Sequence, residues 1–141
     1  MKAKLMLQSL LIALLFGITH AQNETGTSVY TPEKGTLERS EILEALRSSV
    51  YDIHHTKVIF VVNYLRIYNG WAWIHTLPRQ ADGTDQYEDI LALLHKEEEW
   101  KILEIPCAEE DNPECITSEN YFRGLKQRFP DLPECILPDY D

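Results

Sequence analysis

The stretch RIYNGWAWIHTLP (66–78) decides the fold. Its Asn69-Gly70 pair is the strongest short hairpin signal in the chain, because a type I′ turn needs positive φ at both central residues. The run VIFVVNYLRIY (58–68) before the turn is rich in β-branched and aromatic residues, which favours a strand. Residues 71–79 return as the second strand. The pattern therefore predicts an antiparallel hairpin.

A two-residue turn places Tyr68 opposite Trp71 and sorts the hairpin side chains into two faces, since side chains alternate along a strand. One face is apolar, and we expect the first helix to pack on it. It comprises Ile59, Val61, Leu65, Ile67, Ala72 and Ile74, with Asn63 and Thr76 further along. The other face, called the aromatic face below, mixes rings with polar tips. It comprises Phe60, Val62, Tyr64, Arg66, Tyr68, Trp71, Trp73 and His75.

The aromatic face has two interpretations. Indole N–H and phenol O–H groups need hydrogen-bond partners, which suits a partly wet surface. An exposed apolar patch of this size would be unusual on a monomer and would mark a ligand groove or a partner surface. Alternatively, the C-terminal segment covers the face and turns it into a second small core. The sequence leaves both interpretations open.

Two further strands follow the hairpin. A turn at Asp82-Gly83 precedes a strand over 87–96, and the acidic run 97–99 leads into a strand over 100–105. Four consecutive strands joined by short turns predict an antiparallel meander.

Helices flank the meander on both sides. Thr36 can cap the first, with Glu38 in its first turn, and its apolar stripe repeats at helical spacing. The stripe consists of Ile42, Leu43, Leu46 and Val50. Thr117 or Ser118 can cap the second helix, which Pro130 ends. Its apolar residues are Tyr121, Phe122, Leu125 and Phe129. The order predicts an α+β domain, with an N-terminal helix on a four-stranded antiparallel sheet and a short C-terminal helix.

The first 21 residues have the layout of a secretory signal peptide. Two early lysines precede an apolar run that is unbroken over 10–18, and Thr19-His20-Ala21 is a small-x-small cleavage site. A membrane anchor is the rival, but a spanning helix needs about 20 apolar residues and the chain after Ala21 is polar. We therefore expect a signal peptide over 1–21, a flexible lead-in over 22–35 and one domain over 36–141.

The charge balance restricts the partners. The chain has 13 Lys and Arg against 23 Asp and Glu, a net charge of −10. Nucleic acids and anionic membrane surfaces attract clustered basic residues, so both are unexpected partners. After signal cleavage we expect no membrane association.

Cysteine usage fits export. The three cysteines are Cys107, Cys115 and Cys135, so at most one intramolecular bridge can form. Cys107 and Cys115 bracket a short polar loop and are the natural pair, although Cys135 could compete because DNPEC and DLPEC are alike. A metal site is not expected, because there is no C-x-x-C and no histidine nearby.

Catalytic signatures are absent from the sequence. It contains no nucleophile elbow, phosphate loop, H-E-x-x-H or dinucleotide fingerprint. His54 and His55 are expected in a loop after the first helix, and acidic residues near Asp82 are expected to be solvated turn charges. If the chain is an enzyme, a group such as His75 beside Tyr64 would supply the acid or base. No cofactor is expected.

Several short motifs resemble a group of small secreted bacterial proteins of unknown function. They are Gly35-x-x-x-Arg39-x-x-Ile42-Leu43-x-Ala45-Leu46-Arg47, Phe60-Val61-Val62, Leu65-Arg66, Gly70-Trp71-Ala72, Asp82-Gly83, Leu93-Leu94 and Trp100-Lys101. The resemblance implies a cystatin-like or NTF2-like fold, a helix laid on a curved antiparallel sheet, and a periplasmic or secreted location. The cystatin inhibitor motif Q-x-V-x-G is absent from the first hairpin. The resemblance implies no activity, because such folds carry both enzymes and binders.

The sequence favours an exported, non-catalytic binding or interaction module. The expected ligand or partner residues are Tyr64, Arg66, Trp71, Trp73 and His75, with Arg39 as a further candidate. The partner would be a small molecule, a peptide or a second subunit. Arg39 lies on the apolar stripe of the first helix, where an arginine usually extends to solvent or meets a carboxylate. The alternative function is an NTF2-like pocket enzyme that uses His75 or Arg39 on a small molecule.

Overall fold

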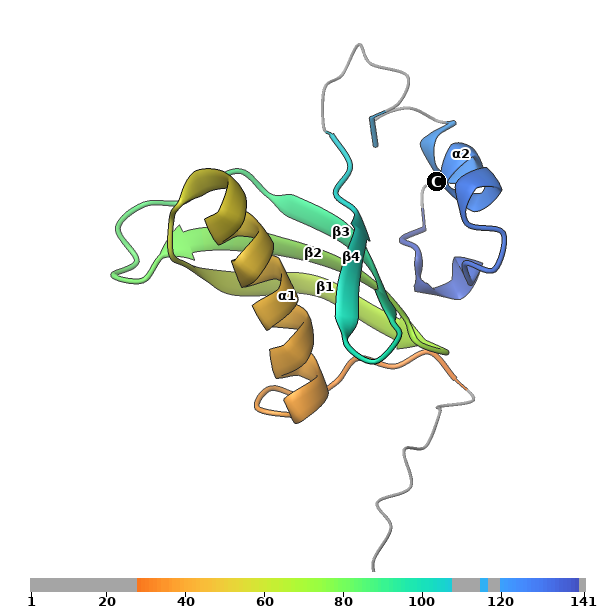
Figure 1. The fold of residues 1–141 in the computed structure, drawn as a ribbon, viewed down its shortest axis with the longest axis horizontal. Helices are drawn as coiled ribbons and strands as arrows, with labels where there is room; N and C mark the ends of the chain where they lie inside the picture. The colour runs from red at the N-terminus through yellow and green to blue at the C-terminus, as the bar shows by residue number, and fades with distance from the viewer. Residues whose placement is uncertain (1–27, 108–114, 117–119, 140–141) are drawn as a thin grey trace, which may run out of the picture.

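A computed structural model describes residues 28–107, 115–116 and 120–139. The elements, in chain order, are α1 (Leu37–His54), β1 (Val58–Tyr68), β2 (Trp71–Gln80), β3 (Ile90–Lys96), β4 (Trp100–Glu104), α2 (Tyr121–Arg128) and the 3-10 helix η1 (Glu134–Ile136). The strands form one antiparallel sheet in the order β1-β2-β3-β4 (Figure 1). The predicted α+β arrangement is confirmed. The expected signal peptide lies outside the described residues, as do all residues between Cys107 and Cys115.

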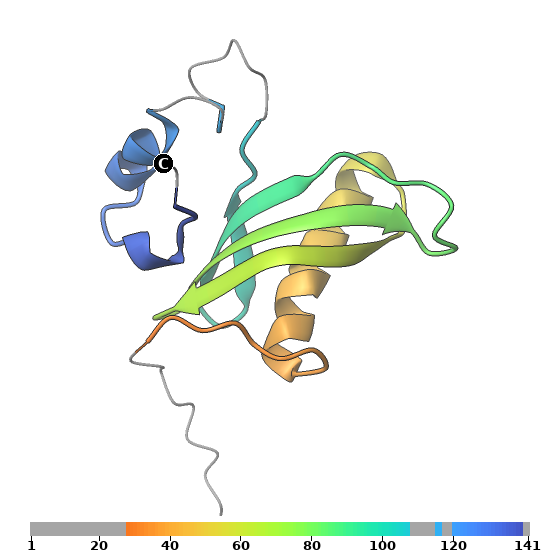
Figure 2. The ribbon, with the colours of Figure 1, turned by 180° about the vertical axis from the view of Figure 1, so that it is seen from behind.

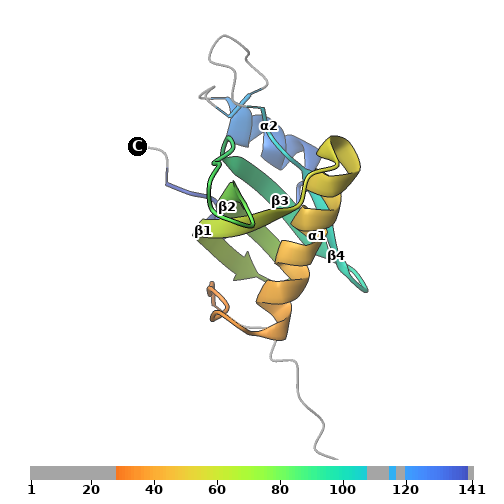
Figure 3. The same ribbon diagram turned by 90° about the vertical axis from the view of Figure 1, so that its left-hand side faces the viewer.

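One face of the sheet is covered by α1, as the view from the side shows (Figure 3). The helix buries its stripe residues Ile42, Leu46 and Val50. The core between helix and sheet is mostly aliphatic, and its buried members are Ile42, Leu46, Leu65, Ile67, Ala72, Ile74, Ala92, Leu94 and Trp100. Removal of this apolar surface from water is the main stabilising term for the layer.

The ends of α1 are set locally. Thr36 occupies the expected capping position, but its hydroxyl donates to the Glu33 carbonyl at 2.8 Å and makes no cap hydrogen bond to the helix. The helix stops where His55 adopts a left-handed conformation with φ 52° and donates its N–H to the Tyr51 carbonyl. His54 is thus the last residue of α1, so its expected place in the loop after the helix was wrong. His55, the next residue, is the one that ends the helix.

The predicted hairpin is present in the predicted register. Asn69 and Gly70 have φ of 48° and 77°, as a type I′ turn requires. Tyr68 then pairs with Trp71, and the pairs Ile67–Ala72, Leu65–Ile74 and Tyr64–His75 follow. The local signal in the Asn-Gly pair therefore sets the phase of the hairpin.

A β-bulge at Asn63 overturns part of the face assignment. Val62 pairs with Thr76 and Tyr64 pairs with His75, so Asn63 is an extra residue on β1. Because one inserted residue reverses the alternation, Phe60 and Val62 pack against the α1 core and do not belong to the aromatic face. Ile59 and Val61, expected under the helix, are instead 46% and 39% exposed.

The later boundaries differ slightly from expectation. β3 begins at Ile90, three residues later than predicted, and β4 ends at Glu104. Residues 87–89, predicted as the start of this strand, lie before it. Tyr87 still donates its backbone N–H to the Pro78 carbonyl of β2 at 3.0 Å. Asn120 precedes α2, whereas Thr117 and Ser118, the expected caps, lie outside the described residues.

Residues 121–137, called the C-terminal cover here, pack on the other face of the sheet. Their contacts form a second buried cluster of Trp71, Trp73, Leu93, Tyr121, Leu125, Leu132, Ile136 and Leu137. Figure 2 shows that this segment lies over one end of the sheet and leaves the strands uncovered toward the other end. Within the described part of the chain, every helix is too short or too polar to span a bilayer.

Candidate functional site

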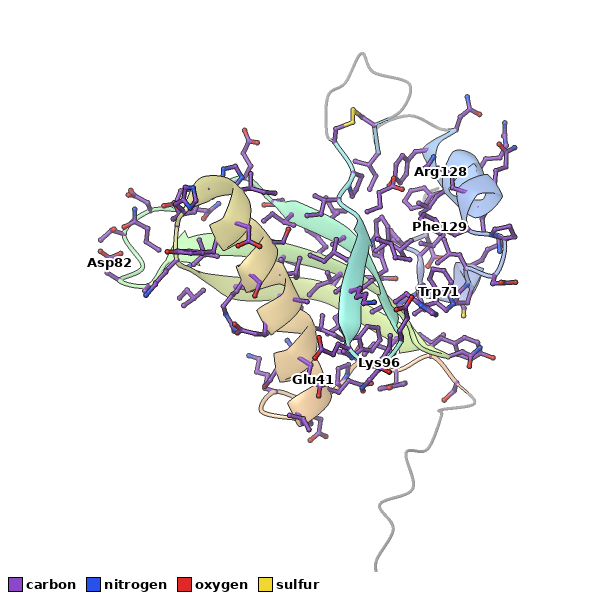
Figure 4. All side chains as sticks on the ribbon, viewed as in Figure 1. Glu41, Trp71, Asp82, Lys96, Arg128 and Phe129 are labelled. Carbon is purple, nitrogen blue, oxygen red and sulfur yellow. A yellow bond between two sulfur atoms is a disulfide. The ribbon has the colours of Figure 1, made fainter. Side chains whose placement is uncertain are left out.

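Both indoles of the aromatic face are buried. Trp73 has no exposed surface and Trp71 is 9% exposed. The Trp73 ring meets Phe122 edge-on at 5.6 Å between centroids, and Trp71 meets Phe129 at 6.1 Å. Figure 4 shows Trp71 and Phe129 together at the covered end of the sheet. In this structure the two indoles form a second core beneath the C-terminal cover, and they do not line an open groove.

Tyr64 and Arg66 lie at the seam between the sheet and the cover. The Tyr64 hydroxyl donates to the Ile136 carbonyl at 2.9 Å. The Arg66 guanidinium carbon is 4.9 Å from the centre of the Tyr64 ring, a cation–π distance. Arg66 also donates from Nη1 to the Cys135 carbonyl at 3.5 Å, so both side chains contact the cover. Their role in ligand binding stays a prediction.

His75 lies on the same face of the sheet as Tyr64, in the middle of β2. Its Nε2 atom is 2.5 Å from Oδ2 of Asp89, and the two side chains are 32% and 47% exposed. A carboxylate in this position fixes the orientation of the imidazole. His75 is the most accessible polar group among the predicted binding residues on β2.

Arg39 is not part of this group. It projects from α1, on the opposite face of the sheet, and donates to the Pro32 carbonyl at 3.0 Å. It therefore fastens the segment before α1 to the helix. The structure brings together the five predicted residues of β1 and β2 and leaves Arg39 apart.

The predicted disulfide is confirmed. Cys107 and Cys115 are bonded, with their Cα atoms 4.7 Å apart, and Cys135 is unbonded and exposed. Among the described residues, no three His, Cys, Asp or Glu side chains converge closely enough to hold a metal ion.

Asp82 serves the turn before β3. Its carboxylate accepts hydrogen bonds from the backbone N–H of Thr84 at 3.0 Å and from the Thr84 hydroxyl at 2.8 Å. These hydrogen bonds lower the pKa of Asp82, because they stabilise the ionised form. The turn lies at the far end of the sheet from the C-terminal cover (Figure 4).

A cleft of about 500 Å³ opens between the C-terminal end of α1 and the adjacent end of the sheet. Its apolar lining consists of Val50, Val58, Pro78 and Ile90. Its polar lining consists of His54, Thr56, Tyr87, Glu88 and Asp89. Among these described lining residues are two carboxylates, Glu88 and Asp89, and neither Lys nor Arg. The volume is in the range of small-molecule sites.

Sequence reasoning missed this cleft. The sequence predicts solvated turn charges for the acidic residues near Asp82, which include Glu88 and Asp89, and a loop position for His54. The cleft depends on where the end of α1 lies over the sheet, and no local pattern encodes that placement. One signal was available: α1 ends near the start of β1, so its last turn must lie beside Val58.

Comparison of the chain with protein-family models, with curated proteins and with solved structures finds no match. The site must therefore be interpreted from its own geometry.

Proposed function

We propose that this chain is an exported, non-catalytic binding protein, and that the cleft at the end of α1 is its ligand site. The observation that carries the proposal is the cleft itself, about 500 Å³ with a lining of both apolar and polar residues. Ligand sites commonly combine apolar walls with a few placed polar groups. On the aromatic face, by contrast, Trp71 and Trp73 are buried beneath the C-terminal cover.

The lining favours a small amphipathic molecule with a positive charge. Val50, Val58, Pro78 and Ile90 offer an apolar surface to a hydrocarbon or ring. Glu88 offers a carboxylate to an amine, and the carboxylate of Asp89, which also contacts His75, lies beside it in the lining. The net charge of −10 attracts cations over a longer range.

Export is supported by two features. The disulfide between Cys107 and Cys115 is typical of an oxidising compartment. The first 21 residues have the three-part pattern of a signal peptide. Together they favour a periplasmic or secreted protein.

The test uses two probes of similar size and opposite charge, phenethylamine and 3-phenylpropionate. Titration followed by amide chemical shifts should move resonances of the cleft residues with the amine and leave them in place with the acid. Glu88→Gln should weaken amine binding by about threefold to tenfold. Glu33→Gln, an exposed change at the opposite end of α1, should leave it unchanged. Equal responses to both probes, or shifts outside the cleft only, would refute the assignment.

An enzyme acting on a small molecule is the second candidate, and one observation favours it. The His75–Asp89 contact at 2.5 Å orients an imidazole as general bases are oriented. Hydrolysis of p-nitrophenyl acetate that is lost in His75→Gln and kept in His95→Gln would support the enzyme over the binding protein.

A further inference from the structure

β1 is an edge strand, and the N-terminal segment covers only one end of it. Tyr30 and Ile67 exchange backbone hydrogen bonds of 3.0 and 2.8 Å, and the Thr31 hydroxyl donates to the Leu65 carbonyl. The chain then turns into α1 at Leu37. The described N-terminal segment therefore protects residues 65–67 and does not reach 58–62. Figure 2 shows β1 along the margin of the sheet.

In the uncovered part of β1, residues 58–62, every second residue directs its backbone N–H and C=O groups away from β2. Phe60 lies opposite Pro78, which has no N–H and whose carbonyl accepts from Tyr87 at 3.0 Å. Opposed residues in an antiparallel pair exchange two hydrogen bonds or none, so Phe60 directs its N–H and C=O away from β2. Val58 and Val62, two residues to either side of Phe60, have the same orientation. These three residues form an open hydrogen-bonding edge.

The side chains of this edge are apolar. The run VIFVV (58–62) has no charge, and Ile59 and Val61 are 46% and 39% exposed. Natural proteins usually protect an edge with charges, prolines or a short strand, and an unprotected edge is a template for pairing. A strand that pairs with this edge would end at the Asn63 bulge, because the bulge interrupts the regular backbone. Further along β1, Tyr30 already pairs with Ile67.

We propose that β1 pairs antiparallel with β1 of a second copy of this chain, about a two-fold axis at Phe60. Phe60 then faces Phe60 of the second copy, and Val58 faces its Val62. Each of these outward pairs exchanges two backbone hydrogen bonds. Ile59 faces Val61 of the second copy, so the exposed side chains cover one another. The result is a continuous eight-stranded sheet with an isologous interface.

Local charge favours a second copy over a basic partner. A groove of about 440 Å³ runs beside this edge on the α1 side. Its charged lining residues are Glu44, Arg47, Asp52 and Lys57, two of each sign. Arg47 and Glu44 already pair at 2.5 Å. The edge is thus neutral on a strongly acidic chain, so two copies can approach there with little repulsion.

The first experiment measures association by sedimentation velocity up to about 200 µM, a range that captures weak complexes. All variants carry Cys135→Ser, which removes disulfide exchange through the exposed thiol. The background protein should show a monomer–dimer equilibrium. Ile59→Lys should weaken it by at least about tenfold, because the lysine would lie against Val61 of the second copy. Leu103→Lys is the matched control, because Leu103 is 39% exposed against 46% for Ile59 and lies on the other edge strand, and it should leave association unchanged.

The second experiment tests the register. Ile59 and Val61 of the second copy form a non-hydrogen-bonded pair, whose short Cα separation suits a disulfide. The double variant Ile59→Cys/Val61→Cys should oxidise to a covalent dimer, and neither single variant should. A monomer at all concentrations, equal effects of Ile59→Lys and Leu103→Lys, or crosslinking by the single variants would each overturn the proposal. None of these outcomes bears on amine binding in the cleft, so the two proposals fail separately.

Discussion

The two faces of the sheet are covered by different kinds of structure. On one face lies α1, an 18-residue helix whose stripe meets a mostly aliphatic surface. On the other face lies the C-terminal cover, which contains an eight-residue helix, a three-residue 3-10 helix and irregular chain. The first layer is a regular element on a regular surface, whereas the second has little regular structure of its own.

The difference explains why the rings of Trp71 and Trp73 lie under the C-terminal cover. A short, irregular segment contributes only isolated apolar residues such as Leu125, Leu132 and Ile136, and large rings fill the remaining space. Polar contacts add to this packing. Glu104 accepts hydrogen bonds from the Tyr121 hydroxyl at 2.7 Å and from Arg128 at 2.6 and 2.8 Å. The cover is thus held by aromatic rings and by hydrogen bonds to Glu104, whereas α1 is held mainly by aliphatic side chains.

The largest expected effect is the loss of the Trp73 ring. Trp73→Ala should lower the free energy of unfolding by about 3–5 kcal/mol, because it leaves a cavity between sheet and cover. Urea denaturation followed by far-UV circular dichroism measures the change. Trp73→Phe should cost clearly less. Self-association should stay unchanged in Trp73→Phe, because Trp73 pairs with Arg66 and not with the open part of β1 at 58–62.

A loss below about 1 kcal/mol for Trp73→Ala would mean that the cover does not depend on the ring. Ile42→Ala, on the α1 side, provides the comparison between faces. It should also destabilise strongly, by about 2–5 kcal/mol, because Ile42 is fully buried. If only the α1 side is sensitive, the two layers do not form one cooperative domain.

The α1 face was predictable from the sequence because its signals are local. The Asn69-Gly70 turn sets the register, and the 3.6-residue repeat of Ile42, Leu46 and Val50 identifies the buried stripe. The bulge at Asn63 was not predictable, because strand alternation continues smoothly through the apolar run on both sides of it. One unrecognised inserted residue exchanged the faces of Ile59 and Val61 with those of Phe60 and Val62.

The sites were harder to predict than the fold. The residues near Trp73 were correctly grouped by alternation, but whether a later segment covers them is a tertiary question. Residues 129–139 contain several prolines and no periodic pattern that assigns them to the sheet. The cleft beside His54 likewise depends on the placement of α1 over the sheet. Both features arise from contacts between segments distant in sequence.

The disulfide provides a test with a smaller expected loss of stability, on the side of the C-terminal cover. Replacing Cys107 and Cys115 together by serine should cost about 2–3 kcal/mol, from the loop-closure entropy restored to the unfolded chain. Thermal unfolding of the oxidised protein and of the variant measures it. Cys135→Ser is the matched control and should change stability little, because Cys135 is exposed and unbonded. An equal loss of stability in the double variant and in Cys135→Ser would indicate that Cys135 also bonds.

The smallest expected effect concerns the α1 side and appears only at high pH. Burial, with the hydrogen bond from the Tyr30 hydroxyl to Glu38 at 2.8 Å and the charge of that carboxylate, raises the pKa of Tyr30 to about 12. In the unfolded chain the phenol ionises near 10.0. Between these values the unfolded state loses a proton that the folded state keeps, so stability falls as pH rises.

Tyr30→Phe removes this proton linkage. The stability of the natural sequence should therefore decline more steeply than that of Tyr30→Phe above about pH 10, while the difference between them stays constant at lower pH. Urea denaturation at a series of pH values measures both curves. Tyr51→Phe, on the exposed side of the same helix, should follow the natural sequence. Parallel curves for Tyr30→Phe and the natural sequence would show that the Tyr30–Glu38 contact does not fasten the N-terminal segment to α1. The N-terminal segment would then be held by its backbone hydrogen bonds to Ile67 and by the hydrogen bond from Arg39 to Pro32, without a contribution from the Tyr30 hydroxyl.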